Sequence, residues 1–168
     1  MIVGIDPGQS NAAAMLANWQ APIRRKIGQY EYEIPPIVGI DAWQMAMPDS
    51  ADPYIWLVTE GQWLKGKATK NKDAILSLAI DTGIMLGRIC TRYNVPGYVL
   101  PVGTWKTLVL QAAHTDKFVH ANQIAKLLTA NEVCMLPKGP RKLDALSAIG
   151  IAFAAYLLGD RLEGYRRC

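Results

Sequence analysis

The chain has 168 residues, 51% of them hydrophobic and 19% charged, a balance typical of a globular protein that buries a substantial core. Lysine and arginine outnumber aspartate and glutamate by 18 to 14, which favours an anionic partner such as nucleic acid only weakly. We find neither a signal peptide nor an apolar stretch of about 18 residues, so we expect no membrane partner and a cytoplasmic location. The three cysteines lack CxxC spacing, which argues against a zinc site or a disulfide framework and for a reducing cytosol.

The first part of the chain is predicted to form a meander of three strands. Two short apolar runs, Ile2–Ile5 and Ala12–Leu16, predict a β-hairpin. Lys26–Ile34 alternates apolar and polar residues, which predicts a third strand with one solvated face. Two prolines end this strand, and the stretch that follows, as far as Pro53, is predicted to be loop.

The second part is predicted to alternate strands and helices. Tyr54–Thr59 is continuously apolar, which is typical of a central strand covered on both faces. Alternation of this kind implies parallel pairing, and with the meander it predicts an α/β fold with a mixed central sheet flanked by helices. No linker interrupts the chain, so a single domain over residues 1–168 is expected. The later elements are a helix at Asp73–Tyr93, a strand at Gly97–Leu100 and helices at Phe118–Leu128 and Leu143–Leu158.

Three carboxylates stand at the ends of buried elements. Asp6 follows the first strand, Glu60 ends the most apolar strand, and Asp144 lies within the first turn of the last helix. Each alone has an ordinary explanation: turn chemistry, a polar strand end, or stabilisation by the helix dipole. If the three converge, their repulsion requires a divalent cation, and hard oxygen ligands select Mg²⁺ or Mn²⁺ over zinc. A pair of such ions can activate water and stabilise the leaving oxygen in phosphodiester hydrolysis.

Five segments spread over nearly the whole chain share a further property: in this order they resemble one known family. They are MIVGIDPG, VTEGQW, Thr82-Gly83, PVGTWK and DALSAIGIA. The chain resembles the RuvC family of Holliday junction resolvases, within the RNase H-like superfamily. The resemblance implies an RNase H-like fold, a homodimer, and four-way or branched DNA as substrate. It also implies two Mg²⁺ or Mn²⁺ ions as cofactors, held by the catalytic residues Asp6, Glu60 and Asp144. It also implies a bacterial cytoplasm or a phage-infected cell as the location.

The same resemblance assigns DNA contacts to several aromatic and basic residues. Trp63 takes the place of an aromatic side chain that stacks in the opened junction, a sequence-tolerant contact. Lys106 and Lys117 take the places of lysines that face DNA. A basic loop after Glu60 is interpreted either as a solvated loop or, more sharply, as a phosphate-contacting surface whose binding would depend strongly on salt. Its residues are Lys65, Lys67, Lys70 and Lys72.

One position departs from the family pattern. The family has an Asp or His one turn before its last aspartate, and this chain has Arg141, which cannot bind a metal. Another acid then supplies the ligand, or the second metal is held more weakly, or Arg141 contacts the scissile phosphate. A further alternative is a catalytically silent junction-binding protein. A YqgF-like nuclease that acts on RNA is the alternative among enzymes.

Two smaller expectations concern packing. The helix at Asp73–Tyr93 carries apolar residues on more than one face, including Ile80, Ile84 and Met85, which suggests a partner and agrees with a homodimer. Trp105 is expected to serve for packing and His120 to lie at the surface or cap a helix.

Overall fold

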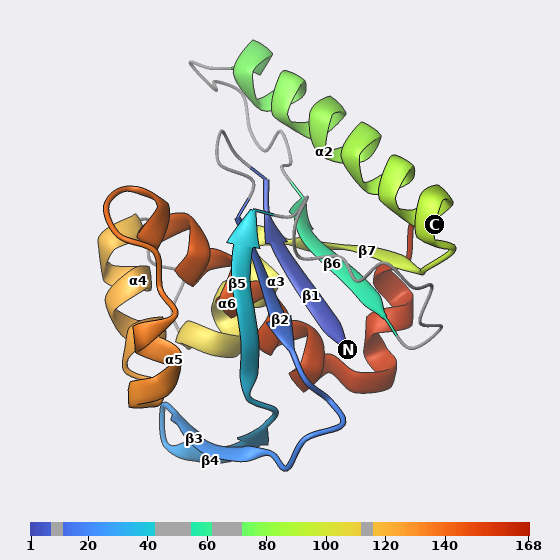
Figure 1. Cartoon of the computed structure of the whole chain (residues 1–168). Helices are drawn as coiled ribbons and strands as arrows, with labels where there is room; N and C mark the ends of the chain where they lie inside the picture. Colours follow the sequence, from blue (N-terminus) through green and yellow to red (C-terminus); the bar gives the residue numbers. More distant parts are fainter. Residues whose placement is uncertain (8–11, 43–54, 62–71, 112–115) are drawn as a thin grey trace.

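The computed structural model of the chain describes residues 1–7, 12–42, 55–61, 72–111 and 116–168. Its centre is a five-stranded sheet, drawn in Figure 1. In spatial order the strands are β5 (Ile37–Ala42), β2 (Ala12–Leu16), β1 (Ile2–Asp6), β6 (Trp56–Gly61) and β7 (Gly97–Pro101).

The central sheet is mixed. β1 runs antiparallel to β2, and β2 runs antiparallel to β5. On the other side of β1, β6 lies parallel to it and β7 lies parallel to β6. The predicted combination of a three-strand meander with parallel strands is therefore confirmed.

The third strand of the meander is not the predicted one. β3 (Ile23–Ile27) and β4 (Tyr30–Ile34) pair with each other in a separate two-stranded sheet. Gly28 turns this hairpin with a φ of 62°, a value that glycine adopts without steric cost. The alternation across Lys26–Ile34 was therefore wrongly interpreted as one strand, since it spans a strand end, a turn and a second strand. The meander continues in β5, at the start of the stretch predicted to be loop; residues 43–54 lie outside the described part of the chain.

Helices cover both faces of the central sheet (Figure 1). The helices predicted at residues 73–93, 118–128 and 143–158 are confirmed as α2 (Lys72–Tyr93), α4 (Lys117–Ala125) and α6 (Arg141–Leu158). Three short elements were not predicted: α3 (Val102–Leu110), α5 (Ala130–Cys134) and the 3-10 helix η1 (Gly159–Tyr165).

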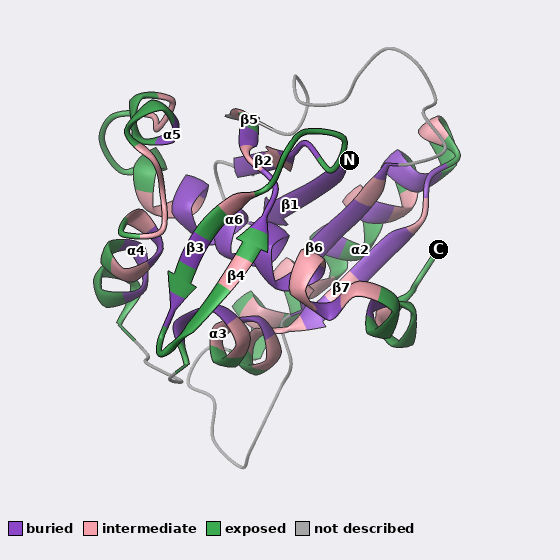
Figure 2. Ribbon diagram, turned by 90° about the horizontal axis from the view of Figure 1, so that it is seen from below, coloured by how far each residue is buried: buried purple, intermediate pink, exposed green. Residues whose placement is uncertain are grey.

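Alternate residues of the strands face two separate cores. Ile2 and Val58 pack in the larger core with α3, α4 and α6, whereas Val3 and Leu57 pack in the smaller core with α2. This is the two-residue period of a strand buried on both faces. Figure 2 shows the result: β1 is buried along its length, while the β3–β4 hairpin is largely exposed.

α6 lies very close to the middle of the sheet. It crosses β1 at Gly4, where a Cβ atom would overlap the backbone of Ala148 and Ala152. The middle of α6 is accordingly rich in alanine and is completely buried. The absence of a side chain at Gly4 therefore fixes the distance between α6 and β1, and with it the position of the first turn of the helix over the end of the strand.

A buried ion pair fastens the β3–β4 hairpin to the rest of the fold. The Arg25 guanidinium donates to both oxygens of Glu132, at 2.8 and 2.6 Å, and to the Leu127 carbonyl. Burial alone would raise the pKa of Glu132, but hydrogen bonds from Arg25 and from the backbone of Ile37 and Thr129 outweigh it and hold the pKa below its ordinary value. The pair thus joins β3, the start of β5 and α5.

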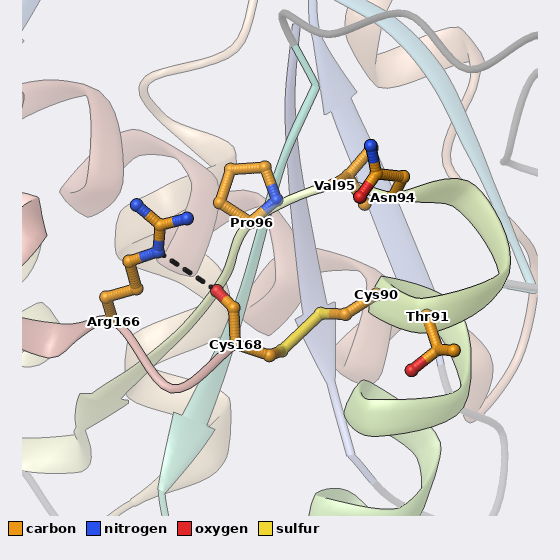
Figure 3. A pocket seen from close by; sticks show the side chains of 7 residues that line it. All are labelled: Cys90, Thr91, Asn94, Val95, Pro96, Arg166 and Cys168. Carbon is orange, nitrogen blue, oxygen red and sulfur yellow. Dashed lines mark hydrogen bonds between the residues drawn. A yellow bond between two sulfur atoms is a disulfide. The ribbon is translucent and has the colours of Figure 1, made fainter.

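The end of the chain closes one edge of the sheet. Arg167 donates its backbone N–H to the Gly97 carbonyl at 2.8 Å, and Arg166 forms an isolated bridge with Tyr98, so these residues extend the sheet beyond β7. Figure 3 shows a disulfide between Cys168 and Cys90 of α2, beside an open pocket. The expectation that the cysteines form no disulfide was therefore wrong for this pair.

Within the part of the chain that the structure describes, two helices have the length and hydropathy of a membrane span, contrary to the sequence-based expectation. They are α2 and the stretch Arg141–Tyr165. Most of the second is buried inside the fold, as expected of a core helix, whereas α2 carries exposed Asp81 and Arg88 near its middle. The absence of a membrane partner stays a prediction.

Candidate active site

The close approach of α6 to β1 brings two of the predicted acids together. Asp6 lies two residues after Gly4, so its side chain lies on the same face of the sheet and faces α6. Asp144 lies one helical turn before Ala148, the residue that covers Gly4. A step of two residues along the strand therefore matches a step of one turn along the helix, and the two carboxylates meet.

The third acid, Glu60, lies on β6, the strand next to β1. Gly4 of β1 pairs with Val58 of β6 in parallel register, and Glu60 follows Val58 by two residues. Glu60 is thus next to Asp6, on the same face of the sheet. Its negative charge acts on Asp6 and raises the pKa of that group. The structure thus brings together Asp6, Glu60 and Asp144, as the family resemblance implied and as periodicity alone could not show.

Lys117, the first residue of α4, supplies a positive charge to this group. Its Nζ lies 2.6 Å from Asp144 Oδ1 and 3.7 Å from Asp6 Oδ2. Burial lowers the pKa of Lys117, but the hydrogen bond to Asp144 and the charges of the three acids outweigh burial and raise it above its ordinary value. The ammonium is therefore held charged between two of the three carboxylates.

Asp6 is the most strongly perturbed of the acids. Its exposed fraction is only 7%. Burial, together with the charges of Glu60 and Asp144, raises its pKa to about 7, although the charge of Lys117 and a hydrogen bond with Ser147 act in the opposite direction. The site therefore holds more negative charge than Lys117 compensates, and an added cation would favour the ionised carboxylate.

A divalent cation such as Mg²⁺ or Mn²⁺ requires several oxygen donors close together. Across the five described ranges of the chain, no three side chains of His, Cys, Asp or Glu stand close enough to hold a metal as they lie. The chemistry nevertheless fits, because carboxylate oxygens are the ligands that Mg²⁺ and Mn²⁺ prefer. The present arrangement is an ion pair of the Lys117 ammonium with the Asp144 and Asp6 carboxylates, with Glu60 beside Asp6.

Comparison with solved structures identifies the fold of the chain. The structure of Thermus thermophilus RuvC matches with a TM-score of 0.53 and 14% identity, over 99% of this chain and 98% of that chain. The chain has an RNase H-like fold. A second structure, T. thermophilus RuvC in complex with a Holliday junction substrate, gives a TM-score of 0.47 at 14% identity, over 95% of this chain and 94% of that chain. No protein-family model and no curated protein sequence matches the chain.

The fold spreads the predicted DNA-contacting residues that the structure describes over four helices. Lys106 lies on α3, Arg141 is the exposed first residue of α6, one turn before Asp144, and Lys72 is the exposed first residue of α2. Lys117 pairs with the acids, as described above. The remaining four predicted residues lie outside the described part of the chain: Trp63, Lys65, Lys67 and Lys70.

Two residues that contact the acids, Trp105 and Ser147, were not predicted from the sequence to belong to the site. Trp105 on α3 does pack in the core, as expected, but its indole N–H also donates to Glu60 Oε2 at 2.9 Å. Ser147, one turn after Asp144, reaches Asp6. His120 is buried against Trp105, so the expectation of a surface position was wrong. The only sequence signal for these contacts was that Trp105 immediately precedes Lys106 and that Ser147 follows Asp144 by three residues.

Proposed function

We propose that the chain is a Mg²⁺- or Mn²⁺-dependent endonuclease that cuts four-way or otherwise branched DNA. The observation that carries the proposal is the convergence of Asp6, Glu60 and Asp144, from three separate elements, on one incompletely compensated negative site. The RNase H-like fold and the likeness to a protein named RuvC support it, as do the basic residues that begin α2, α4 and α6.

The three acids would hold the metal ions, two in this proposal, with Arg141 in the place of a further ligand. Bound there, such ions would activate water and stabilise the leaving oxygen of a phosphodiester. Lys117 compensates Asp6 and Asp144 in the present arrangement. With such ions held by the acids, the Lys117 ammonium would no longer be needed for that compensation and would be available to a phosphate oxygen of the substrate.

Arg141 adds a fixed positive charge at the same edge of the site. It is exposed and lies one turn before Asp144, at the N-terminus of α6, where backbone N–H groups also favour anions. A guanidinium there can bind a phosphate through two hydrogen bonds. We therefore assign Arg141 to the scissile phosphate or its neighbour, in place of a metal ligand.

The first experiment compares substrates. Labelled four-way DNA junction, linear duplex DNA and structured RNA are incubated with the wild type and with Asp6→Asn, in Mg²⁺ or Mn²⁺. The proposal predicts paired symmetric nicks in the junction, little cutting of the other two substrates, and no cutting by Asp6→Asn. Preferential cutting of RNA would replace it with an RNA nuclease, and absence of both cutting and binding would overturn the junction assignment.

Binding without cutting is the second candidate function, and one observation favours it. Lys117 already lies between Asp6 and Asp144, and the described acids do not form a ready ligand cluster. If the ammonium never leaves, the chain would bind junctions as a silent protein. Tight junction binding with no nicks in either metal, for the wild type and for Lys117→Met, would select this alternative.

We also propose a homodimer formed through α2. Leu76, Ile80 and Ile84 repeat every four residues on its outer side and are 51%, 52% and 49% exposed. A Cβ atom on Gly83 or Gly87 would meet no described atom within 4 Å, so a partner helix can approach closely beside these residues. An apolar stripe with an adjacent pair of glycines fits the same stripe on a second copy, in a two-fold arrangement.

Sedimentation of purified protein tests the dimer. Ile80→Glu places a charge in the stripe and should convert the dimer to a monomer. Ala74→Glu is the matched control, because Ala74 is exposed on another side of α2 and should leave the dimer intact. A monomeric wild type, or equal behaviour of the two variants, would contradict the assignment.

A further inference from the structure

We infer that Trp105 is a positioning residue that fixes the orientation of Glu60. The inference rests on the proposed function, since it assigns Glu60 to the cation site. It starts from one hydrogen bond: the Trp105 indole Nε1–H donates to Glu60 Oε2 at 2.9 Å, and the two residues are 45 positions apart in the sequence.

The indole N–H has a strong reason to keep this partner. Trp105 is 1% exposed, so its N–H is out of reach of bulk water. An indole nitrogen donates and cannot accept, and a buried one that lacks an acceptor is destabilising. A hydrogen bond to a charged acceptor is also shorter and stronger than one to a neutral acceptor. Glu60 is thus held through one of its two oxygens.

The indole itself is fixed by the elements around it. On α6, a Cβ atom at Gly150 would lie only 2.8 Å from Trp105 Cζ3, so the ring fills the space that this glycine leaves. On α4, the His120 ring meets the indole edge to face, with 6.4 Å between ring centroids. Lys106 Nζ lies 5.5 Å from the ring centroid, within range of a cation–π contact. These contacts leave the indole one orientation.

The same contacts link three of the elements that carry the site, β6, α6 and α4. The indole bonds to Glu60 on β6, packs against α6, which carries Asp144, and meets His120, one turn after Lys117 on α4. A glutamate has three side-chain torsions, and the hydrogen bond from the indole restricts the orientations that the Glu60 side chain can adopt. Because the indole is fixed by α6 and α4, the Glu60 carboxylate is aligned with the groups that those helices carry.

The contact is tested first without any metal. In the ¹⁵N–¹H spectrum of the whole chain, the Trp105 indole resonance is assigned by its loss in Trp105→Phe. Glu60→Gln should shift this resonance and speed its exchange with solvent, and should leave the Trp56 indole resonance in place. An unchanged Trp105 resonance would overturn the inference, whatever the protein does with metal or DNA.

The positioning role is tested by Mn²⁺ binding, measured from the paramagnetic resonance signal of the free ion. Groups that orient metal ligands typically contribute about 10- to 100-fold to metal affinity, so Trp105→Phe should weaken Mn²⁺ binding by about that factor. Trp56→Phe removes a half-buried indole from the first residue of the strand that carries Glu60, four residues away from it. At that separation the substitution should change Mn²⁺ binding less than about twofold.

A double-variant comparison separates orientation from general damage. If Trp105 acts through Glu60, Trp105→Phe should add nothing to the loss caused by Glu60→Gln. An equal loss in both backgrounds, or a loss matched by Trp56→Phe, would show that Trp105 serves only packing and would overturn the inference. A wild type that binds no Mn²⁺ contradicts the proposed function instead, and the indole spectrum then decides whether Trp105 orients Glu60.

Discussion

The two faces of the central sheet are built from the same strands and are covered very differently. On one face, α6 lies against β1 at Gly4, and α3 and α4 pack beside it. On the other face, α2 buries only Thr82, Leu86, Ile89 and Cys90 and leaves an apolar stripe outside. The three acids and Lys117 lie on the closely packed face, and the apolar stripe of α2, which we propose as the dimer surface, lies on the other face.

The difference follows from what a site and an interface require. Carboxylates can be held near one another only where rigid elements fix them and a counter-charge is close, and the first turns of α4 and α6 supply both at the end of β1. A single amphipathic helix supplies neither, but it can pack with a second copy of itself. Substitutions on the closely packed face should therefore reduce the free energy of unfolding strongly, and substitutions on the α2 face should reduce it little.

The largest stability loss is expected at the buried ion pair on the closely packed side. Arg25→Ala leaves the Glu132 carboxylate buried without its partner and should reduce the free energy of unfolding by about 3–5 kcal/mol. The adjacent Arg24 pairs with Glu31 at the surface, 3.8 Å away, so Arg24→Ala should cost less than about 1 kcal/mol. Urea denaturation of both variants checks this, and equal losses would contradict it.

The second effect concerns Asp6 and depends on pH. Its pKa is about 7 in the folded chain and 3.8 as a free group. The stability that Asp6 contributes is thus fully present below about pH 4 and is lost as pH rises through 7. Asn carries no such penalty, so the stability of Asp6→Asn relative to the wild type should increase between pH 4 and pH 8, by on the order of 4 kcal/mol.

The measurement for Asp6 is urea denaturation at a series of pH values in the presence of EDTA. Addition of Mg²⁺ at pH 8 should then stabilise the wild type and not the variant, because only the wild type keeps the carboxylate. A difference between the two proteins that does not change with pH would refute the electrostatic account of the site.

The smallest of the three effects compares one glycine from each face. Gly4→Ala forces a methyl group against the backbone of α6 and should cost about 1–3 kcal/mol or more, with loss of the site geometry. Gly83→Ala is made in the Ile80→Glu background, where the proposed dimer cannot form. Gly83 then has open space around it in the described structure, and the substitution should stabilise α2 by up to about 1 kcal/mol. Thermal unfolding measures both, and destabilisation by Gly83→Ala would contradict the view of α2 as a loosely covered helix.

Much of the architecture was predictable because the buried elements have strong periods. The strands β1, β2, β6 and β7 and the helices α2, α4 and α6 all follow from apolar runs or helical spacing. The third strand was misplaced because Gly28 turns the chain inside a regular alternation, and α3 was missed because it begins directly after Pro101 with Val102 and Gly103, both weak helix formers.

The candidate site was predictable only in part. The acids were recognisable because each is a charged residue at the end of an apolar element. Their partners depend on tertiary contacts between distant residues: Lys117 meets Asp144 across 27 residues and Trp105 meets Glu60 across 45. The bond between Cys90 and Cys168 spans 78 residues and was likewise invisible to spacing rules.

The most direct test of the central claim measures cutting and binding of one four-way junction under single-turnover conditions. The variants are Asp6→Asn, Glu60→Gln and Asp144→Asn. The account predicts that each lowers the cleavage rate by at least about 100-fold while the dissociation constant for the junction stays near that of the wild type. An acid variant that cuts at the wild-type rate, or one whose lost cutting is explained by lost binding, would contradict it.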